Sequence, residues 1–421
     1  MTAISINKFK GPSTVLFFIG LCSAFKFQLV GTIFVSDAIL IFLLPFLAFR
    51  SGSRELLRLA APLLLMLGLW LVGAILTDMI RQTAFSDYAR GWSKIVFFAM
   101  AFTAVLLISG AKIDRLMSYF AGLAVAGIMS TALFPNAYQT SIPWKFGYAT
   151  PIALLTVIFS SISNRSSTLR QLFPTFVMAA INLMMNFRSM FAMLIATTAI
   201  GALSAIAQAL APGRRLVSAG FAVAVIALGG AGVWGGSVVY GQFAESGMLG
   251  LAAKQKFEGQ NQGGMGLLLG GRSEALVSTR AIADSPFIGH GSWPEDRYYV
   301  ALQILLLREK GVQYTGENFS SLLIPAHSYL LGSWVEAGIA GGLFWIVILV
   351  LMFRSLFFLI DLRSPATPFA AFTLIQLLWN IPFSPFGADV RFFVAGQLCV
   401  IIWAFQQAKH SPTGRSAPRS M

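Results

Sequence analysis

The stretch SYLLGSWVEAGIAGGLFWIVILVLMF, residues 328–353, decides the fold. Its only charged residue is Glu336, and it is longer than the roughly 20 residues that a helix needs to cross the hydrocarbon core of a bilayer. The apolar run is continuous and does not alternate with polar residues, so it predicts a membrane-spanning helix rather than a strand of a membrane barrel.

The composition of the whole chain extends this prediction. Of 421 residues, 57% are hydrophobic and 11% are charged, with a mean hydropathy of +0.75, whereas soluble domains are about 45–50% apolar and 25% charged. We therefore predict an all-α, polytopic membrane protein. Both cysteines, Cys22 and Cys399, lie within apolar runs, which excludes a disulfide framework or a thiolate metal site.

Apolar runs between charged clusters predict about twelve spans. They are residues 13–32, 35–49, 59–77, 91–109, 116–134, 148–163, 172–187, 189–209, 216–240, 328–353, 367–383 and 391–408. The first run lacks the small-x-small exit of a signal peptide, so we expect it to remain as an uncleaved helix.

Lysine and arginine predict the orientation of these spans. If Lys8 and Lys10 are cytoplasmic, the segments on the same side also hold Arg50, Arg54, Arg58, Lys112, Arg115, Arg165, Arg170, Arg214, Arg215, Arg354, Arg363, Lys409, Arg415 and Arg419. Since such residues in short loops stay in the cytoplasm, we expect both termini there. The net charge of +14 lies between spans rather than on one soluble face, so we expect no nucleic acid partner.

One connection is long and faces outward by the parity of the spans. We therefore divide the chain into an N-terminal bundle of about nine spans (1–240), a large outer loop (241–327), and C-terminal helices with a cytoplasmic tail (328–421). Capping and stop signals predict a loop helix from Ser273 to Asp284. They also predict an amphipathic helix in RYYVALQILLLREKG that ends at Gly311 and could lie on the membrane surface.

Several motif classes are missing from the sequence. It has no GxxxxGK[ST] loop, no HExxH and no GxSxG, so we expect neither a nucleotide nor another cofactor. Glu295 and Asp296 are a weak candidate for a divalent metal site. They have no histidine or third carboxylate nearby, and we expect no metal.

Arginines near the outer surface are the strongest candidates for ligand binding. Arg188 interrupts INLMMNFRSMFAML at the junction of two spans, where a charge is costly and often functional, although a snorkelling side chain is the alternative. Arg272 precedes Ser273, whose helix start favours a phosphate or diphosphate, unless the arginine is simply solvated. Further outward-facing cations that could assist, or contact lipid headgroups instead, are Arg90, Lys94, Arg297 and Arg391.

Histidine offers a candidate proton acceptor. His327 ends the outer loop directly before the helix that starts at Ser328, so its imidazole is expected at the outer boundary, as a base or as a hydrogen-bonded interfacial group. His290 is the competitor, but it lies in a turn made by Pro286, Gly289 and Gly291. Conformation explains that turn better than catalysis does.

Glu336 is predicted to have a positioning role. It follows His327 by nine residues, about 13 Å deeper along a helix and out of phase with it. We expect its carboxylate to pair with a cation such as Arg188. Gly338, together with Gly341 and Gly342, is expected to let another helix approach closely.

Three motifs, in this order, resemble one family. NFRSMFAMLIA, GGRSEALVSTRAIADSPFIGHG and AHSYLLGSWVEAGIAGG are similar in spacing and topology to the O-antigen ligase and polymerase family of bacterial membrane glycosyltransferases. The resemblance covers roughly residues 180 to 345. It implies a glycosyltransferase C-like fold in the bacterial inner membrane, with the active site and large loop on the periplasmic side.

The resemblance also implies a mechanism. Transfer would be metal-independent and inverting, from a glycan donor on undecaprenyl diphosphate. Arg188 and Arg272 would bind the diphosphate, and His327 would orient or deprotonate the acceptor hydroxyl. The diphosphate is already an activated leaving group, so the reaction requires no nucleotide. Fixed cations would stabilise the negative charge that develops as the diphosphate leaves.

The acceptor stays open between two possibilities. It is another lipid-linked repeat in a polymerase of O-antigen or exopolysaccharide, or the lipid A core in a ligase of lipopolysaccharide biosynthesis. Ser328, where the family commonly has asparagine, and the long outer loop favour the polymerase, for which a chain-length regulator is a possible partner. A precursor transporter or flippase is the alternative of another class, but the sequence lacks the internal symmetry common in transporters.

Overall fold

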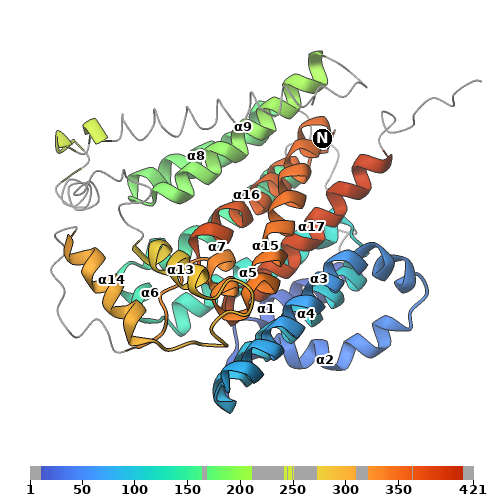
Figure 1. Ribbon diagram of the computed structural model, residues 1–421. Coiled ribbons are helices and arrows are strands. Elements are labelled where there is room, and N and C mark those ends of the chain that lie inside the picture. The colour runs from blue at the N-terminus through green and yellow to red at the C-terminus, as the bar shows by residue number, and fades with distance from the viewer. Residues whose placement is uncertain are drawn as a thin grey trace, which may run out of the picture.

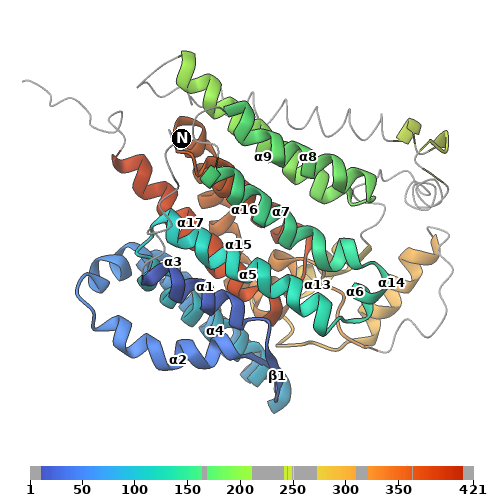
Figure 2. The ribbon, with the colours of Figure 1, turned by 180° about the vertical axis from the view of Figure 1, so that it is seen from behind.

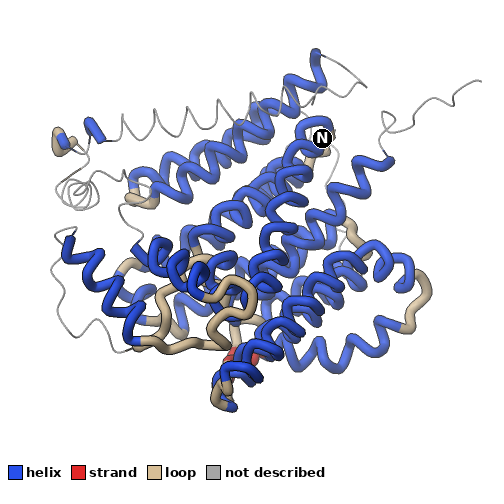
Figure 3. The backbone as a smooth tube through the Cα atoms, in the orientation of Figure 1, coloured by secondary structure: helices blue, strands red, loops and turns tan. Residues whose placement is uncertain are grey.

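The computed structural model describes residues 11–163, 168–210, 241–243, 245–248, 250, 273–309, 321–362 and 364–410. The fold is all-α, with 81% of the described residues helical, and its long helices lie side by side in one bundle (Figures 1 and 3). Within the described residues, seven helices are long and apolar enough to cross a membrane. The structure is therefore that of a membrane-embedded protein.

The helices follow the predicted spans closely, apart from the first. Before residue 241 they are α1 (Pro12–Cys22), α2 (Val35–Ala48), α3 (Ser53–Arg81), α4 (Phe85–Ser109), α5 (Ile113–Leu133), α6 (Ala137–Ser141), the π-helical turn η2 (Trp144–Tyr148), α7 (Ala149–Ser163), α8 (Thr168–Met184) and α9 (Arg188–Leu210). Later in the chain they are α13 (Ser273–Asp284), α14 (Arg297–Glu309), α15 (Tyr329–Asp361), α16 (Thr367–Phe383), the 3-10 turn η4 (Ala388–Val390) and α17 (Arg391–His410). The predicted span 216–240 lies outside the described residues, and the total of twelve stays a prediction.

The first predicted span, 13–32, is wrong in its length. Helix α1 ends at Cys22, where the Ser23 hydroxyl donates to the carbonyl of Gly20 at 2.6 Å and so competes with the helical hydrogen bonds. The chain then forms a hairpin in which β1 (Lys26–Gln28) pairs antiparallel with β2 (Thr32–Phe34). Its apolar residues made the hairpin look like a continuation of the helix.

The bundle has two ends, which we call the loop end and the tail end. The loop end carries α13 and α14, and the tail end is where α17 finishes at His410 (Figures 1 and 2). α13 begins and ends where the sequence predicted, and α14 begins at Arg297; its predicted stop, Gly311, lies outside the described residues. Tyr299 of α14 is buried, and its hydroxyl donates to Asp284 at 2.9 Å. One face of α14 therefore packs against α13.

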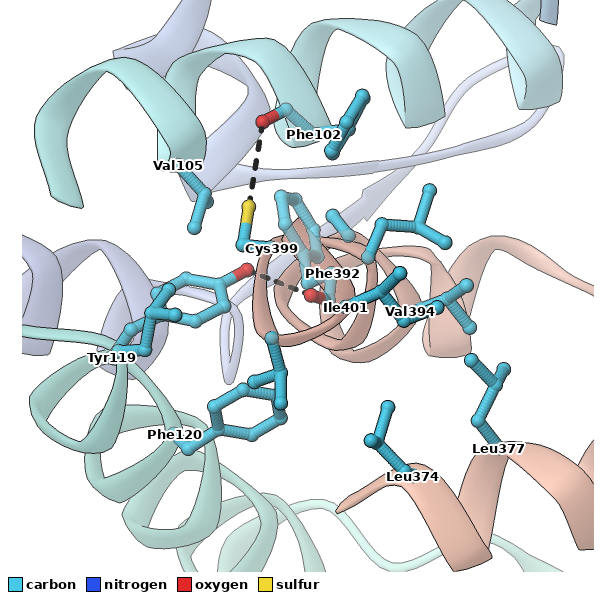
Figure 4. Close-up of a cluster of buried hydrophobic side chains, with 14 of the residues drawn as sticks. Phe102, Val105, Tyr119, Phe120, Leu374, Leu377, Phe392, Val394, Cys399 and Ile401 are labelled. Carbon is cyan, nitrogen blue, oxygen red and sulfur yellow. Dashed lines mark hydrogen bonds between the residues drawn. The ribbon is translucent and has the colours of Figure 1, made fainter. Parts of the chain in front are cut away.

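Helix α17 lies in the centre of the bundle and packs against α4, α5, α15 and α16. Its buried surface contains Phe392 and Cys399 (Figure 4). The Tyr119 hydroxyl donates to the Phe392 carbonyl at 2.9 Å, and Cys399 Sγ lies 3.9 Å from the Phe102 carbonyl oxygen. Cys399 and Cys22 are both free thiols. This core fixes the helices whose ends form the loop end.

Candidate functional site

Helix α15 is broken inside the bundle. Ala337 (φ −119°, ψ 17°) and Gly338 (φ 59°, ψ −151°) leave the helical conformation, so the carbonyls of the preceding turn lose their helical donors. The positive φ of Gly338 is one that residues with a side chain rarely adopt. The break therefore depends on glycine at this position and on new donors for the released carbonyls.

Residues 285–293, which we call the clamp loop, supply those donors. The backbone N–H of His290 donates to the Val335 carbonyl at 2.7 Å, and that of Gly291 donates to the Glu336 carbonyl at 3.1 Å. Gly289 lies so close to the break that a Cβ there would be 2.5 Å from the Gly338 nitrogen. The loop thus replaces the helical hydrogen bonds with bonds from outside the helix.

Helix α3 holds the clamp loop from its other side. Arg81 Nε and Nη2 donate to the Gly289 carbonyl at 3.0 and 2.8 Å, and Nη2 also donates to Ser285 Oγ at 2.8 Å. The Thr77 hydroxyl donates to the Ile288 carbonyl. A bidentate guanidinium orders a loop strongly because two bonds fix its direction.

Asp78 is the buried anion of this region. Its carboxylate accepts from the backbone N–H and the hydroxyl of Ser292 at 2.6 and 2.7 Å, and from Trp92 Nε1 at 2.7 Å. Three donors offset the cost of burying the charge. The sequence reading missed Asp78, although an acid at the end of an apolar run was a usable signal.

Glu336 lies directly before the break and pairs with Lys94 of α4, with Nζ and Oε2 2.6 Å apart. Lys94 is buried and Glu336 is partly exposed. The prediction that Glu336 pairs with a cation is therefore confirmed, and the cation is Lys94. The packing of α3, α4 and α15 decides the pairing, and hydropathy does not report it.

The glycines after Glu336 have a different neighbour from the one predicted. A Cβ on Gly338 would collide with the Phe287 carbonyl of the clamp loop, and one on Gly341 with the Ser333 carbonyl of the same helix. Gly342 lies against the ring of Trp334. Their nearest neighbours are thus the clamp loop and the turn of α15 that precedes the break.

His327 is exposed at the start of α15. The next residue, Ser328, is the N-cap: its hydroxyl oxygen accepts from the Leu331 N–H at 3.0 Å and donates to the Ile381 carbonyl of α16 at 2.8 Å. These bonds fix the backbone beside the imidazole. The helix start was predicted correctly.

Arg188 is the first residue of α9, after a tight turn in which Asn186 has φ 57° and the Phe187 N–H donates to the Asn182 carbonyl at 2.8 Å. One of its terminal guanidinium nitrogens is buried. Helix α9 packs against both α15 and α16. The fold therefore brings Arg188 and His327 to the same end of the bundle.

Arg272 lies outside the described residues, directly before α13. α13 is attached to the segment that leads to His327: the Ser278 hydroxyl donates to the Pro325 carbonyl at 2.7 Å. Apolar side chains complete the contact in a small buried cluster formed by Val277, Ala281, Tyr299, Ile324 and Val335. The start of α13 is thereby fixed near the start of α15.

The four further cations predicted to assist have different surroundings. Arg90 pairs with Asp87 at 2.8 Å and lies over the Trp293 ring. Arg391 is buried and pairs with Asp37. Lys94 pairs with Glu336 as described above, and Arg297 is exposed at the first residue of α14. Carboxylates thus compensate three of the four, and a role for any of them in binding diphosphate stays a prediction.

His290 has a structural environment. Its Nε2 lies 2.8 Å from the Ala281 carbonyl oxygen, and its ring packs edge-to-face on Tyr299 at 5.5 Å. The ring nitrogen thus links the clamp loop to α13. Burial and the hydrogen bond to Asp284 raise the pKa of Tyr299 to about 12, which keeps this phenol neutral beside the histidine.

Comparison of the chain with protein-family models and with characterised proteins gives no match.

Proposed function

We propose that this protein is a membrane glycosyltransferase that transfers a glycan from an undecaprenyl-diphosphate carrier to an acceptor hydroxyl at the loop end. One observation carries the proposal: α9 begins at Arg188, α13 begins directly after Arg272, and α15 begins two residues after His327. These helix starts belong to one end of the bundle (Figure 1), where backbone N–H groups and the helix dipoles favour an anion.

The chemistry assigned to these residues is simple. The acceptor oxygen attacks the anomeric carbon while the bond from that carbon to the diphosphate breaks, and the lipid diphosphate leaves with the electron pair. Arg188 and Arg272 stabilise the charge that develops on the diphosphate. His327, exposed beside this region, takes the proton of the hydroxyl.

The reading as a polymerase of lipid-linked repeats is tested by deleting the gene and separating the surface glycans on gels. A lipid A core that carries a single repeat indicates lost polymerisation and supports the proposal. Polymer that accumulates on the lipid carrier, with bare core, indicates a ligase instead. Unchanged glycans would refute both readings.

The residue roles are tested by complementing the deletion with point variants. We expect Arg272→Ala and His327→Ala to reduce product formation at least about 100-fold, with normal amounts of protein in the membrane. His410→Ala, at the last residue of α17 on the tail end, is the matched control and should restore full-length product. Full-length product from His327→Ala would remove that residue from the mechanism.

One observation favours a transporter as the second candidate. Transporters commonly bind substrates at broken helices, and α15 is broken at Ala337 and Gly338. Here, however, the backbone of the clamp loop already occupies the carbonyls of Val335 and Glu336, which supports a structural purpose for the break. Glycan precursors that accumulate facing the cytoplasm in the deletion strain would favour the transporter.

A further inference from the structure

Lys145 is a cation at the loop end that neither the sequence reading nor the proposed mechanism uses. It lies in the π-helical turn η2, which precedes α7; wide turns of this kind are rare and often occur at functional sites. The turn packs tightly on α5, because a Cβ on Gly147 would collide with the Thr131 side chain. The backbone that carries Lys145 is therefore fixed.

Hydrogen bonds connect the segments that carry Lys145 and Arg188. Trp144 Nε1 donates to Asn182 Oδ1 at 3.2 Å, and the Asn182 carbonyl accepts from the N–H of Phe187 at 2.8 Å. Lys145 and Arg188 are thus each one residue away from a group bonded to Asn182. Asn182 therefore connects the turn that carries Lys145 to the turn that leads into Arg188.

Lys145 differs from three other cations of the protein in that no described carboxylate pairs with it. Arg90, Lys94 and Arg391 each form an ion pair with a carboxylate. No described residue offers Lys145 such a carboxylate. Its Nζ lies over the Phe146 ring, 4.7 Å from the ring centroid. A multivalent anion can interact with two half-buried cations that lie on connected segments.

We infer that Lys145 and Arg188 together bind a phosphate-bearing group, and that in this protein the group is the diphosphate of the lipid carrier. The inference rests on the proposed function and adds Lys145 to its binding residues. A lysine is a compact point charge with three donors, so it complements the planar guanidinium of Arg188. The diphosphate is thus bound from η2 as well as from α9.

The test is equilibrium binding of radiolabelled undecaprenyl diphosphate to the purified full-length protein in phosphatidylcholine nanodiscs. We expect Lys145→Met to weaken binding at least about tenfold and Lys145→Arg to restore it to within about threefold. Lys112→Met is the matched control, because Lys112 is exposed at the opposite end of α5. It should bind like the wild type.

The outcomes separate the inference from the proposed function. Wild-type binding with an unchanged affinity of Lys145→Met would overturn the role of Lys145 and leave the proposed function intact. Equal competition by phosphatidylglycerol would overturn the assignment to the carrier in favour of an ordinary anionic headgroup. Failure of the wild type to bind the diphosphate would overturn the proposed function, and the inference with it.

Discussion

Two sides of the loop end handle charge in opposite ways. On the side of α3, α4 and the clamp loop, Asp78 is bonded by three donors and Glu336 pairs with Lys94. On the side of α7 and α9, Lys145 and Arg188 lie on segments that Asn182 connects. The first side compensates its charges with its own residues, whereas on the second side no described carboxylate pairs with Lys145. If the second side is the binding surface that we propose, substitutions on the two sides should differ accordingly.

The largest effect is expected at Asp37, which belongs with the compensated charges. Asp37→Ala leaves the buried Arg391 guanidinium without its carboxylate, which should lower the free energy of unfolding by about 3–5 kcal/mol. The measurement is SDS-titration unfolding in mixed micelles. The double variant Asp37→Ala/Arg391→Met should recover most of the loss, and no recovery would show that the pair is not the cause.

The next effect is expected at the break in α15. Gly338→Ala forces a side chain into a positive φ and against the Phe287 carbonyl, which should cost about 2–4 kcal/mol of unfolding free energy. Gly332→Ala is the control, since its Cβ would make only ordinary contact, 3.7 Å from the Ala326 Cβ. Equal stability of the two variants would contradict the role of the clamp loop.

A smaller effect is expected at the pair beside the break. Lys94→Met leaves the partly exposed carboxylate of Glu336 alone, and because water still reaches it, the loss should be about 1–2 kcal/mol. Lys94→Met/Glu336→Gln should be more stable than the single variant in the same SDS titration. A double variant that is less stable than Lys94→Met would mean that the two groups act separately.

The smallest effect on stability is expected at Lys145. Removing the Lys145 ammonium breaks no ion pair with a described carboxylate. Lys145→Met should therefore change the free energy of unfolding by less than about 0.5 kcal/mol. The same variant should lose affinity for the lipid diphosphate, as argued above. A loss of stability comparable to that of Asp37→Ala would place Lys145 with the scaffold and erase the contrast between the two sides.

Local signals predicted part of this architecture well. The predicted starts of α13 and α15 were correct because each start is signalled by a serine and the residues that directly follow it. Ser328 is the N-cap of α15. The hydropathy of α3, α4, α5 and α9 likewise predicted their approximate bounds. These features depend on residues within one or two helical turns.

Features that depend on distant residues were not predicted. The break in α15 needs donors from His290 and Gly291, and the partner of Glu336 follows from how α4 packs against α15. The network around Asp78 joins α3 to the clamp loop. Hydropathy and capping signals depend on neighbouring residues and do not report contacts between distant segments. The candidate site was therefore predicted as separate residues rather than as a connected structure.

The break in α15 has a consequence for biogenesis. The clamp loop is translated before α15, so its N–H groups already exist when the apolar segment of α15 enters the bilayer. That segment can insert as a continuous helix in which the backbone carbonyls accept hydrogen bonds from N–H groups of the same helix. We expect the break to form when the carbonyls of Val335 and Glu336 exchange these bonds for the N–H groups of the clamp loop, so that the carbonyls are bonded before and after the exchange.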